Sequence, residues 1–371
     1  MFSKPLNFAL VYIVTIFNIV ILLTPFLTLA LPFISFHNNI ITVDYGIFMK
    51  IKLAFFSVCF AVSFLMLFYM LSDFFFGFSI RTSLKKCTRF EKIKDYDFLT
   101  TPFNQVKEKF SQRNVKLYIK NSDEINAYAV SSLGKKAIVL TKGLINHYLV
   151  NSDDPKMFLY AIRSVLSHEM SHLINKDFLP TFLIIINQKV TNFISTILHY
   201  LFHFLVRIMR ALRFTSTTSN FIFDIYTLTN FTLTSFNRFV VYNLYEFLRR
   251  FISRNIEYRC DMQAGKAFGG RNMALALSMM GENGYFTLFS THPSTSKRIN
   301  KVQNIKIQDR IIGARFVDIL SNYFSLMLLL IICLYFAKQA KIDLLLRYYI
   351  KHQNEINGHV SGIWQIINKF F

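Results

Sequence analysis

Long apolar runs alternate with charged stretches along this chain. Two apolar runs lie near the N-terminus, at roughly residues 6–34 and 51–78. Each is long enough to cross a bilayer, because about 20 residues rising about 1.5 Å each cover about 30 Å of hydrocarbon. The first run is longer than the apolar part of a cleavable signal peptide, and no small-x-small cleavage site follows it. We therefore expect it to remain as a membrane anchor.

Three further apolar runs follow, at about 178–206, 221–248 and 316–337. Polar residues interrupt the first two of these, namely Asn187, Gln188 and Lys189 in one and Asp224, Arg238 and Glu246 in the other. This interrupted pair is expected to form a membrane hairpin, with a hairpin lying at the membrane surface as the alternative. A lone Lys at the bilayer centre costs about 2.5–3.5 kcal/mol, so Lys189 is expected near a margin or in a cavity.

The stretches between the apolar runs have the patterns of folded, polar segments. Alternation at 115–119 and the short apolar run at 137–140 predict strands. The pair Asp154-Pro155 provides an N-cap and a first-turn proline, which predicts a helix running to His172 without an internal Gly or Pro. Residues 250–315 form a second polar region of helical character.

Composition and charge support a membrane protein. The chain is 53% hydrophobic and only 17% charged, which is less charge than soluble domains usually carry. Its net charge of +21 is concentrated at the ends of apolar runs, as in the basic stretch 81–94. No nucleic-acid-binding motif accompanies these charges, so we expect no nucleic-acid partner and assign them to topology and contact with the lipid bilayer. The basic stretch predicts that the polar regions face the cytoplasm.

The segment His168-Glu169-Met170-Ser171-His172 carries the strongest chemical signal. Positions i and i+4 share a helix face, so both imidazoles can bind one Zn²⁺ at about 2.0–2.1 Å. Glu169 is turned about 100° away and can take a proton from the attacking water and pass it to the leaving amine. Because two polar histidines on a helix surface would give the same pattern, a third ligand is needed.

Glu257 and Asp261 supply a candidate for this third ligand. They are again four residues apart, on a predicted helix rich in small residues that would allow close packing on the His168 helix. Glu257 would complete a two-histidine, one-glutamate site with the fourth position open to water. Asp261 is placed to accept a hydrogen bond from the far nitrogen of a ligand histidine. Without the histidine motif, a solvated acidic helix face would be the simpler interpretation.

With these residues the chain resembles the HtpX-type membrane metalloproteases, relatives of the CAAX prenyl protease family. Four segments match in the family's order and cover about 125–300: Asn126-Ala127-Tyr128-Ala129 with Thr141-Lys142-Gly143-Leu144, the motif at 168–172, Glu257-Tyr258-Arg259-Cys260-Asp261, and 291–299. Cys260 stands where a smaller residue is commoner, and we interpret it as a packed thiol and not as a ligand.

The resemblance implies a fold and an activity. The expected fold is a mostly α-helical integral membrane protein with a zincin-like catalytic region, helical with a small β-sheet, on four or five apolar helices. The expected activity is zinc-dependent endopeptidase action on membrane or misfolded proteins, in quality control and the stress response of a bacterial cytoplasmic membrane. One Zn²⁺ per chain would be held by His168, His172 and Glu257, with Glu169 as the base.

The resemblance also assigns roles around the metal. The segment Asn126, Ala127, Tyr128 and Ala129 would be an edge strand that receives the substrate by strand addition. His292 would donate to the developing oxyanion, and Arg298 would hold the local structure near the active-site cleft. A surface salt bridge on a proline-fixed loop is the alternative interpretation of Arg298.

We therefore divide the chain into five parts. Two N-terminal transmembrane helices occupy 1–79, and the first half of the catalytic domain occupies 80–177. The expected membrane hairpin occupies 178–249, the second half of the catalytic domain occupies 250–315, and a C-terminal apolar segment with a basic tail occupies 316–371.

Two other functions remain open at this point. An intramembrane-cleaving metalloprotease also uses this histidine motif, but places it inside a transmembrane helix, whereas Arg163, Lys176 and Asp177 bracket the motif helix here. A non-catalytic zinc-binding membrane scaffold would usually have four protein ligands and no adjacent base. Glu169 argues against the scaffold.

Overall fold

The computed structural model describes residues 3–30, 34–37, 40–43, 45–132, 134–211, 216–281, 293–342 and 344. The chain divides into two compact units. The first comprises Met1–Asn18, Met66–Lys189 and Thr234–Leu326, and the second comprises Ile19–Leu65, Val190–Leu233 and Met327–Phe371.

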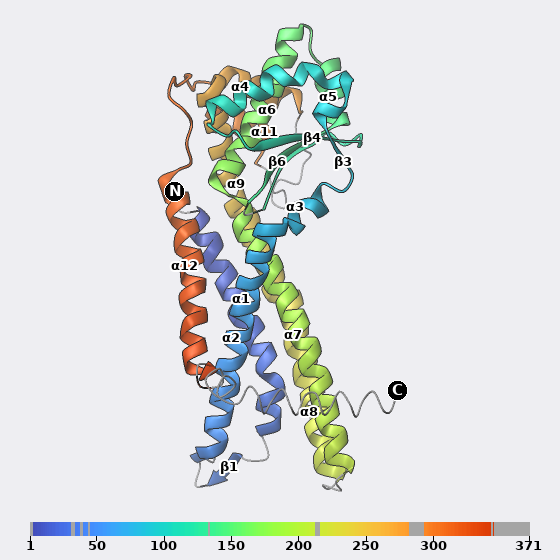
Figure 1. Cartoon of the computed structure of the whole chain (residues 1–371), viewed down its shortest axis with the longest axis vertical. Coiled ribbons are helices and arrows are strands. Elements are labelled where there is room, and N and C mark those ends of the chain that lie inside the picture. Colours follow the sequence, from blue (N-terminus) through green and yellow to red (C-terminus); the bar gives the residue numbers. More distant parts are fainter. Residues whose placement is uncertain are drawn as a thin grey trace, which may run out of the picture. The chain divides into compact units, whose positions relative to one another are not determined.

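A four-stranded mixed sheet lies in the first unit (Figure 1). Its strand order is β3-β4-β6-β5, with bounds Cys87–Arg89, Val115–Lys120, Lys136–Thr141 and Ala127–Ser131. The pair β4 and β6 is parallel, and the other two pairs are antiparallel. The strands predicted from 115–119 and 137–140 are present as β4 and β6. In β4 alternate residues are buried, as expected for a strand that packs one face on a core.

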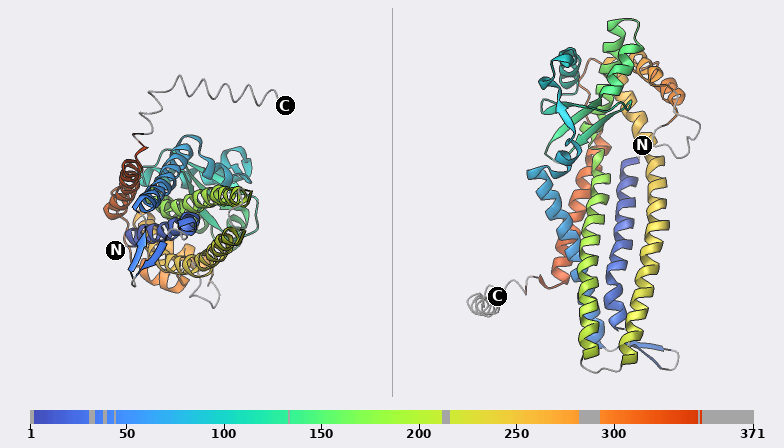
Figure 2. Two further views of the ribbon diagram at one scale, coloured as in Figure 1. Left: turned by 90° about the horizontal axis from the view of Figure 1, so that it is seen from below. Right: turned by 90° about the vertical axis from the view of Figure 1, so that its right-hand side faces the viewer.

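Helix α6 (Pro155–Asn175) packs against this sheet and carries the histidine motif. Its N-terminus is as predicted, because the Asp154 side chain accepts a hydrogen bond of 2.9 Å from the Lys156 amide and Pro155 occupies the first turn. The helix ends at Lys176, whose φ of 54° is left-handed. Figure 2 shows the sheet (teal) beside α6 (green) from two further directions.

Helices α4 (Thr100–Lys109) and α5 (Lys142–Val150) complete the core around α6. Helix α9 (Tyr242–Phe268) packs along α6, followed by α10 (Gly270–Met279) and α11 (Thr295–Val302). Gly270 allows the close approach of the chain after α11, because a Cβ there would lie 1.9 Å from the Val302 carbonyl oxygen. The Tyr148 hydroxyl donates to the Ala276 carbonyl at 2.9 Å and so joins α5 to α10.

Four helices in the described part are long and apolar enough to cross a membrane. Their candidate spans are Ser3–Thr28, Phe48–Phe76, Phe178–Ile208 and Phe316–Gln339. They belong to helices α1 (Ser3–Ala30), α2 (Tyr45–Phe76), α7 (Phe178–Ala211) and α12 (Phe316–Gln339). The predicted fold class, a mostly helical integral membrane protein with a small sheet, is confirmed.

The apolar run at 221–248 is helical but is not one of these candidate spans. It covers parts of α8 (Ser216–Phe236), a π-helical segment (Asn237–Val241) and α9. Ser, Thr and Asn are frequent in α8, which lowers its hydropathy. Whether this run and α7 form a spanning hairpin therefore stays a prediction.

Polar residues inside the apolar helices bond to one another. In the first unit the Asn18 side chain donates to that of Asn187, and the Asn237 amide donates to Asn18 at 2.9 Å. These bonds link α1, α7 and the π-helical segment. In the second unit His199 on α7 and Tyr226 on α8 lie 3.1 Å apart. Such pairs join apolar helices and explain how α7 accommodates its polar residues.

Candidate metal centre

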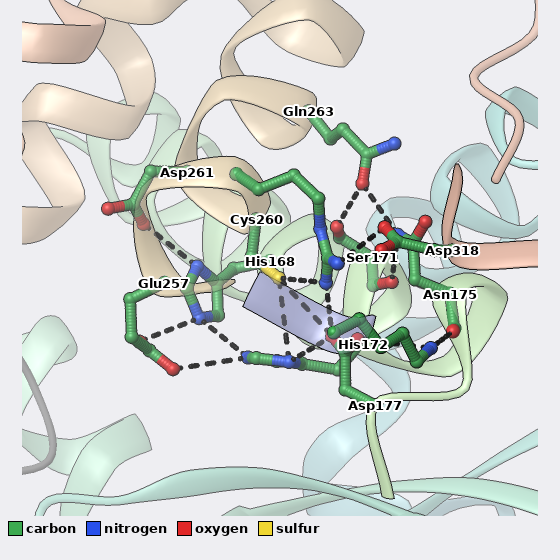
Figure 3. A network of polar contacts seen from close by, with 12 residues as sticks. His168, Ser171, His172, Asn175, Asp177, Glu257, Cys260, Asp261, Gln263 and Asp318 are labelled. Carbon is green, nitrogen blue, oxygen red and sulfur yellow. Dashed lines mark hydrogen bonds and ion pairs between the residues drawn. The ribbon is translucent and has the colours of Figure 1, made fainter. Parts of the chain in front are cut away.

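His168 and His172 lie on one face of α6, and Glu257 meets them from α9 (Figure 3). The two histidine Nε2 atoms are 3.2 Å apart. The Glu257 carboxylate oxygens lie 3.4 Å from Nε2 of His168 and 3.5 Å from Nε2 of His172. The predicted ligand set is therefore brought together by two helices that are far apart in the sequence.

These distances fit a zinc ion. Ligand atoms at about 2.0–2.1 Å from a tetrahedral Zn²⁺ are about 3.3 Å from one another. The three measured separations lie within 0.2 Å of that value. Two imidazole nitrogens and one carboxylate also form a donor set typical of catalytic zinc.

Asp261 and Arg298 fix the orientation of the His168 imidazole through hydrogen bonds. Nδ1 of His168 donates to Asp261 at 2.8 Å, which directs its Nε2 toward Glu257. Arg298 donates from Nε and Nη2 to the two oxygens of Asp261, at 2.7 Å each. Arg298 is buried, so the surface salt bridge considered as an alternative is wrong.

The charges around His168 favour a cation. Burial by itself would lower the pKa of His168, but the hydrogen bonds and charges of Asp261 and Glu257 outweigh it and raise the pKa to about 10. The two carboxylates therefore favour a positive charge beside His168. A bound divalent ion can supply this charge while the imidazole stays neutral.

Asp177 supports His172 in the same way, and the sequence analysis missed this role. Nδ1 of His172 donates to Asp177 at 2.9 Å, and Arg259 on α9 also donates to Asp177. Burial would raise the pKa of Asp177, but the charge of Arg259 and the hydrogen bond from His172 lower it to about 2. A carboxylate five residues after His172 was a signal, although it was interpreted only as the polar end of a helix.

Two residues of the apolar helices complete this support. Arg259 also donates to Asp318 at 2.7 Å, in the first turn of α12. Lys4, in the first turn of α1, lies fully buried with its ammonium 3.6 Å from Asp177, and it donates to the Asn175 carbonyl. From the sequence alone, neither Lys4 nor Asp318 is assigned a role at the metal centre. Cys260 is a buried thiol 3.4 Å from Nδ1 of His172, on the side opposite the shared ligand point.

Glu169 and strand β5 line the cavities that adjoin the metal centre. Two cavities, of about 200 and 400 Å³, are both lined by Asn126, Ala127, His168 and Glu169. The Glu169 carboxylate makes no hydrogen bond or ion pair with the residues that the structure describes. It is therefore available to a water molecule or substrate in the cavity.

The outer edge of β5 carries unpaired backbone groups. Among the described residues, β5 is the last strand of the sheet, with no strand beyond it. The Thr141 amide donates to the Asn126 carbonyl at 3.1 Å, which makes these two a hydrogen-bonded pair. Because such pairs alternate along an antiparallel ladder, the N–H and C=O groups of Ala127 and Ala129 point away from β6. The predicted segment 126–129 thus lies at the edge, while His292 lies outside the described residues.

Comparisons with known proteins identify the family. A model described as "Peptidase family M48" matches residues 103–306, more than half of the chain. The chain belongs to peptidase family M48. This bears out the predicted relationship to the HtpX-type proteases, and with the ligand set it confirms the predicted class, zinc metallopeptidase.

Other comparisons are more distant. A search of the curated proteins finds no match. The crystal structure of S. mikatae Ste24p is similar, with 18% sequence identity and a TM-score of 0.41 over 70% of this chain and 63% of that chain. This M48 protein thus corresponds to less than two thirds of the length of that structure.

Proposed function

We propose that this M48 protein is an endopeptidase that hydrolyses peptide bonds of membrane or misfolded proteins, with Glu169 as its general base. One observation carries the proposal. The unpaired Glu169 carboxylate, the ligand His168 and the edge strand residue Ala127 line the same cavity. A substrate backbone in that cavity would meet the base and the metal ligands together.

Strand addition is the mode of substrate binding that the edge of β5 favours. An extended peptide beside β5 would bond to the outward N–H and C=O groups of Ala127 and Ala129. Main-chain bonds of this kind do not depend on substrate sequence, which suits an enzyme acting on many unfolded proteins. The small side chains of both alanines leave room above the strand for substrate side chains.

The proposed chemistry divides between the metal and its surroundings. Bound zinc would act as a Lewis acid that polarises the scissile carbonyl and lowers the pKa of water. Glu169 would take the proton of the attacking water and deliver it to the leaving amine. Asp261 and Asp177 would hold the two imidazoles in the tautomer that presents Nε2. His292 would donate to the oxyanion.

Observations on α6 and α9 disfavour the two alternatives. Helix α6 is not one of the candidate spans in the described part, and the third span begins at Phe178, after the motif helix has ended. This argues against an intramembrane site. A structural zinc site would use four protein ligands, whereas three side chains converge here beside Glu169.

Wild type and Glu169→Gln, purified in detergent with and without zinc, would test the function on casein and on an unfolded membrane protein. We expect zinc-dependent cleavage by wild type and none by Glu169→Gln at equal zinc content. Equal cleavage by the two proteins would refute the role of Glu169.

The proposed location is a bacterial cytoplasmic membrane, with the metal centre facing the cytoplasm, in protein quality control. The basic stretch 81–94 supports this orientation. Labelling of Asp123→Cys and Gln303→Cys in a cysteine-free chain, from each side of the membrane, would test it. Labelling of both from the outside would contradict the orientation.

A further inference from the structure

A separate, larger cavity lies beside the sheet and is strongly basic. It measures about 960 Å³ and shares no lining residue with the two cavities at the metal centre. Its walls come from α3 (Phe78–Ser83), β3, α4, the start of β4 and the β5–β6 turn. Seven of its twenty lining residues are Lys or Arg, and two are acidic. We call this cavity the basic cleft.

Most of the positive charge in the basic cleft is uncompensated. Arg89 pairs with Glu91 at 3.1 Å, which neutralises one of the two acidic side chains. In the described part of the chain, no carboxylate lies within ion-pair distance of five other lining cations: Arg81, Lys107, Arg113, Lys116 and Lys135. Like charges gathered in a concave site create a positive potential that attracts anions.

The basic cleft begins where a candidate membrane span ends. The α2 span ends at Phe76, and a Cβ added to Gly77 would lie 3.3 Å from the Lys135 ammonium. A Cβ added to Gly134 would lie 3.0 Å from the Phe74 carbonyl oxygen, so the β5–β6 turn touches the last turn of the span. Arg81 follows in the next short helix. A bilayer crossed by this span would place these two cations at the level of the lipid headgroups.

We propose that the basic cleft binds the phosphate-bearing headgroup of an anionic membrane lipid. The position at the end of a span gives a lipid direct access, with its acyl chains remaining in the bilayer. Ile80 and Leu84, which flank Arg81 in the sequence, also line the cleft and would provide apolar contact for the glycerol region. Each Lys or Arg near an anionic membrane surface contributes about 1 kcal/mol to attraction. The cleft gathers several of them around one headgroup.

The test compares two variants of the full chain that lose the same charge. The cleft variant is Arg81→Gln, Lys107→Gln, Lys135→Gln. The control variant is Lys85→Gln, Lys86→Gln, Lys94→Gln, which takes three exposed cations from the same basic stretch without touching the cleft lining. Native mass spectrometry of each detergent-solubilised protein would measure binding of dioctanoyl phosphatidylglycerol, dioctanoyl phosphatidylcholine and inorganic phosphate.

We expect the wild type to prefer phosphatidylglycerol over phosphatidylcholine. The cleft variant should bind phosphatidylglycerol at least about ten-fold more weakly than wild type. The affinity of the control variant for phosphatidylglycerol should change by less than about three-fold. Equal losses in the two variants would show diffuse attraction and overturn the proposal. Binding of inorganic phosphate as tight as that of phosphatidylglycerol would also overturn it, since it would indicate a soluble anion. Unchanged thermal unfolding and zinc content show that the cleft variant is folded; if it is not, Arg81→Gln alone replaces it.

Discussion

Arg298 holds both carboxylate oxygens of Asp261, at 2.7 Å each, directly behind a zinc-ligand histidine. Behind His172, Arg259 holds Asp177 through one oxygen, the Oδ2 that also accepts from His172. Each imidazole is therefore oriented by a carboxylate that an arginine holds in turn. Buried carboxylates fixed in this way keep their charge and their direction, which an ion bound by only three protein side chains requires.

The first prediction concerns the third ligand. Wild type should hold one zinc ion per chain and Glu257→Ala should lose it, because two histidines alone give an incomplete site. Atomic absorption on purified protein measures this. His147→Ala, on α5 away from the ligand point, is the control and should retain full zinc. Full zinc in Glu257→Ala would mean that another residue is the ligand.

Asp177→Asn should weaken zinc binding by about 10–100-fold, because the amide holds His172 less firmly than the carboxylate. Competition with a chelating dye measures the affinity. Asp261→Asn should have a similar effect through His168. If both variants bound zinc as tightly as wild type, these carboxylates would contribute to packing and would not orient the zinc ligands.

Arg259→Met should destabilise the protein by about 3–5 kcal/mol, since it leaves Lys4 as the only buried Lys or Arg beside Asp177 and Asp318 among the described residues. Adding Asp318→Asn restores the charge balance and should recover much of that loss. Thermal unfolding in detergent compares the single and double variants. A double variant less stable than the single one would show that the ion pairs do not act as one network.

Ala129→Pro should raise KM by about 2–10-fold with unchanged zinc, because it removes one outward N–H from the proposed substrate edge. Tyr128→Pro is the matched control. Tyr128 and Val139 of β6 form a hydrogen-bonded pair of the ladder. Tyr128→Pro removes the N–H of that pair and should lower the unfolding temperature instead. If both prolines only destabilised the sheet, β5 would be structural.

His292→Ala should retain zinc yet slow turnover by about 10²–10³-fold, as expected for an oxyanion donor. Zinc content and kcat measured on the same preparation separate this role from metal binding. Normal turnover would show that the segment 291–299 has a structural role only.

The sequence predicted the two histidine ligands because their spacing is local. The four-residue spacing of His168 and His172 places both on one helix face, and the N-cap residue Asp154 marks where that helix begins. Glu257 required only one further step, an acidic pair on a second helix. The family resemblance added Arg298, whose burial decided between its two interpretations.

The residues that orient His172 could not be predicted from local spacing. Lys4, Asp177 and Asp318 are separated by long stretches of chain, and each alone is an ordinary charge at the end of an apolar helix. Only packing of α1, α9 and α12 brings them together. The run at 221–248 illustrates the opposite limit. The sequence shows it as an apolar stretch, but no described helix over it is a candidate span, and a spanning hairpin stays a prediction.

The contact of Arg259 with Asp318 has a consequence for synthesis. Asp318 follows the metal ligands in the chain, and Lys4 precedes them by more than 160 residues. The surroundings of His172 are therefore complete only after translation has passed the last ligand by about 60 residues and α12 has begun to dock. A hydrolase assembled among other nascent chains would remain inactive until the start of α12 has been made and has docked.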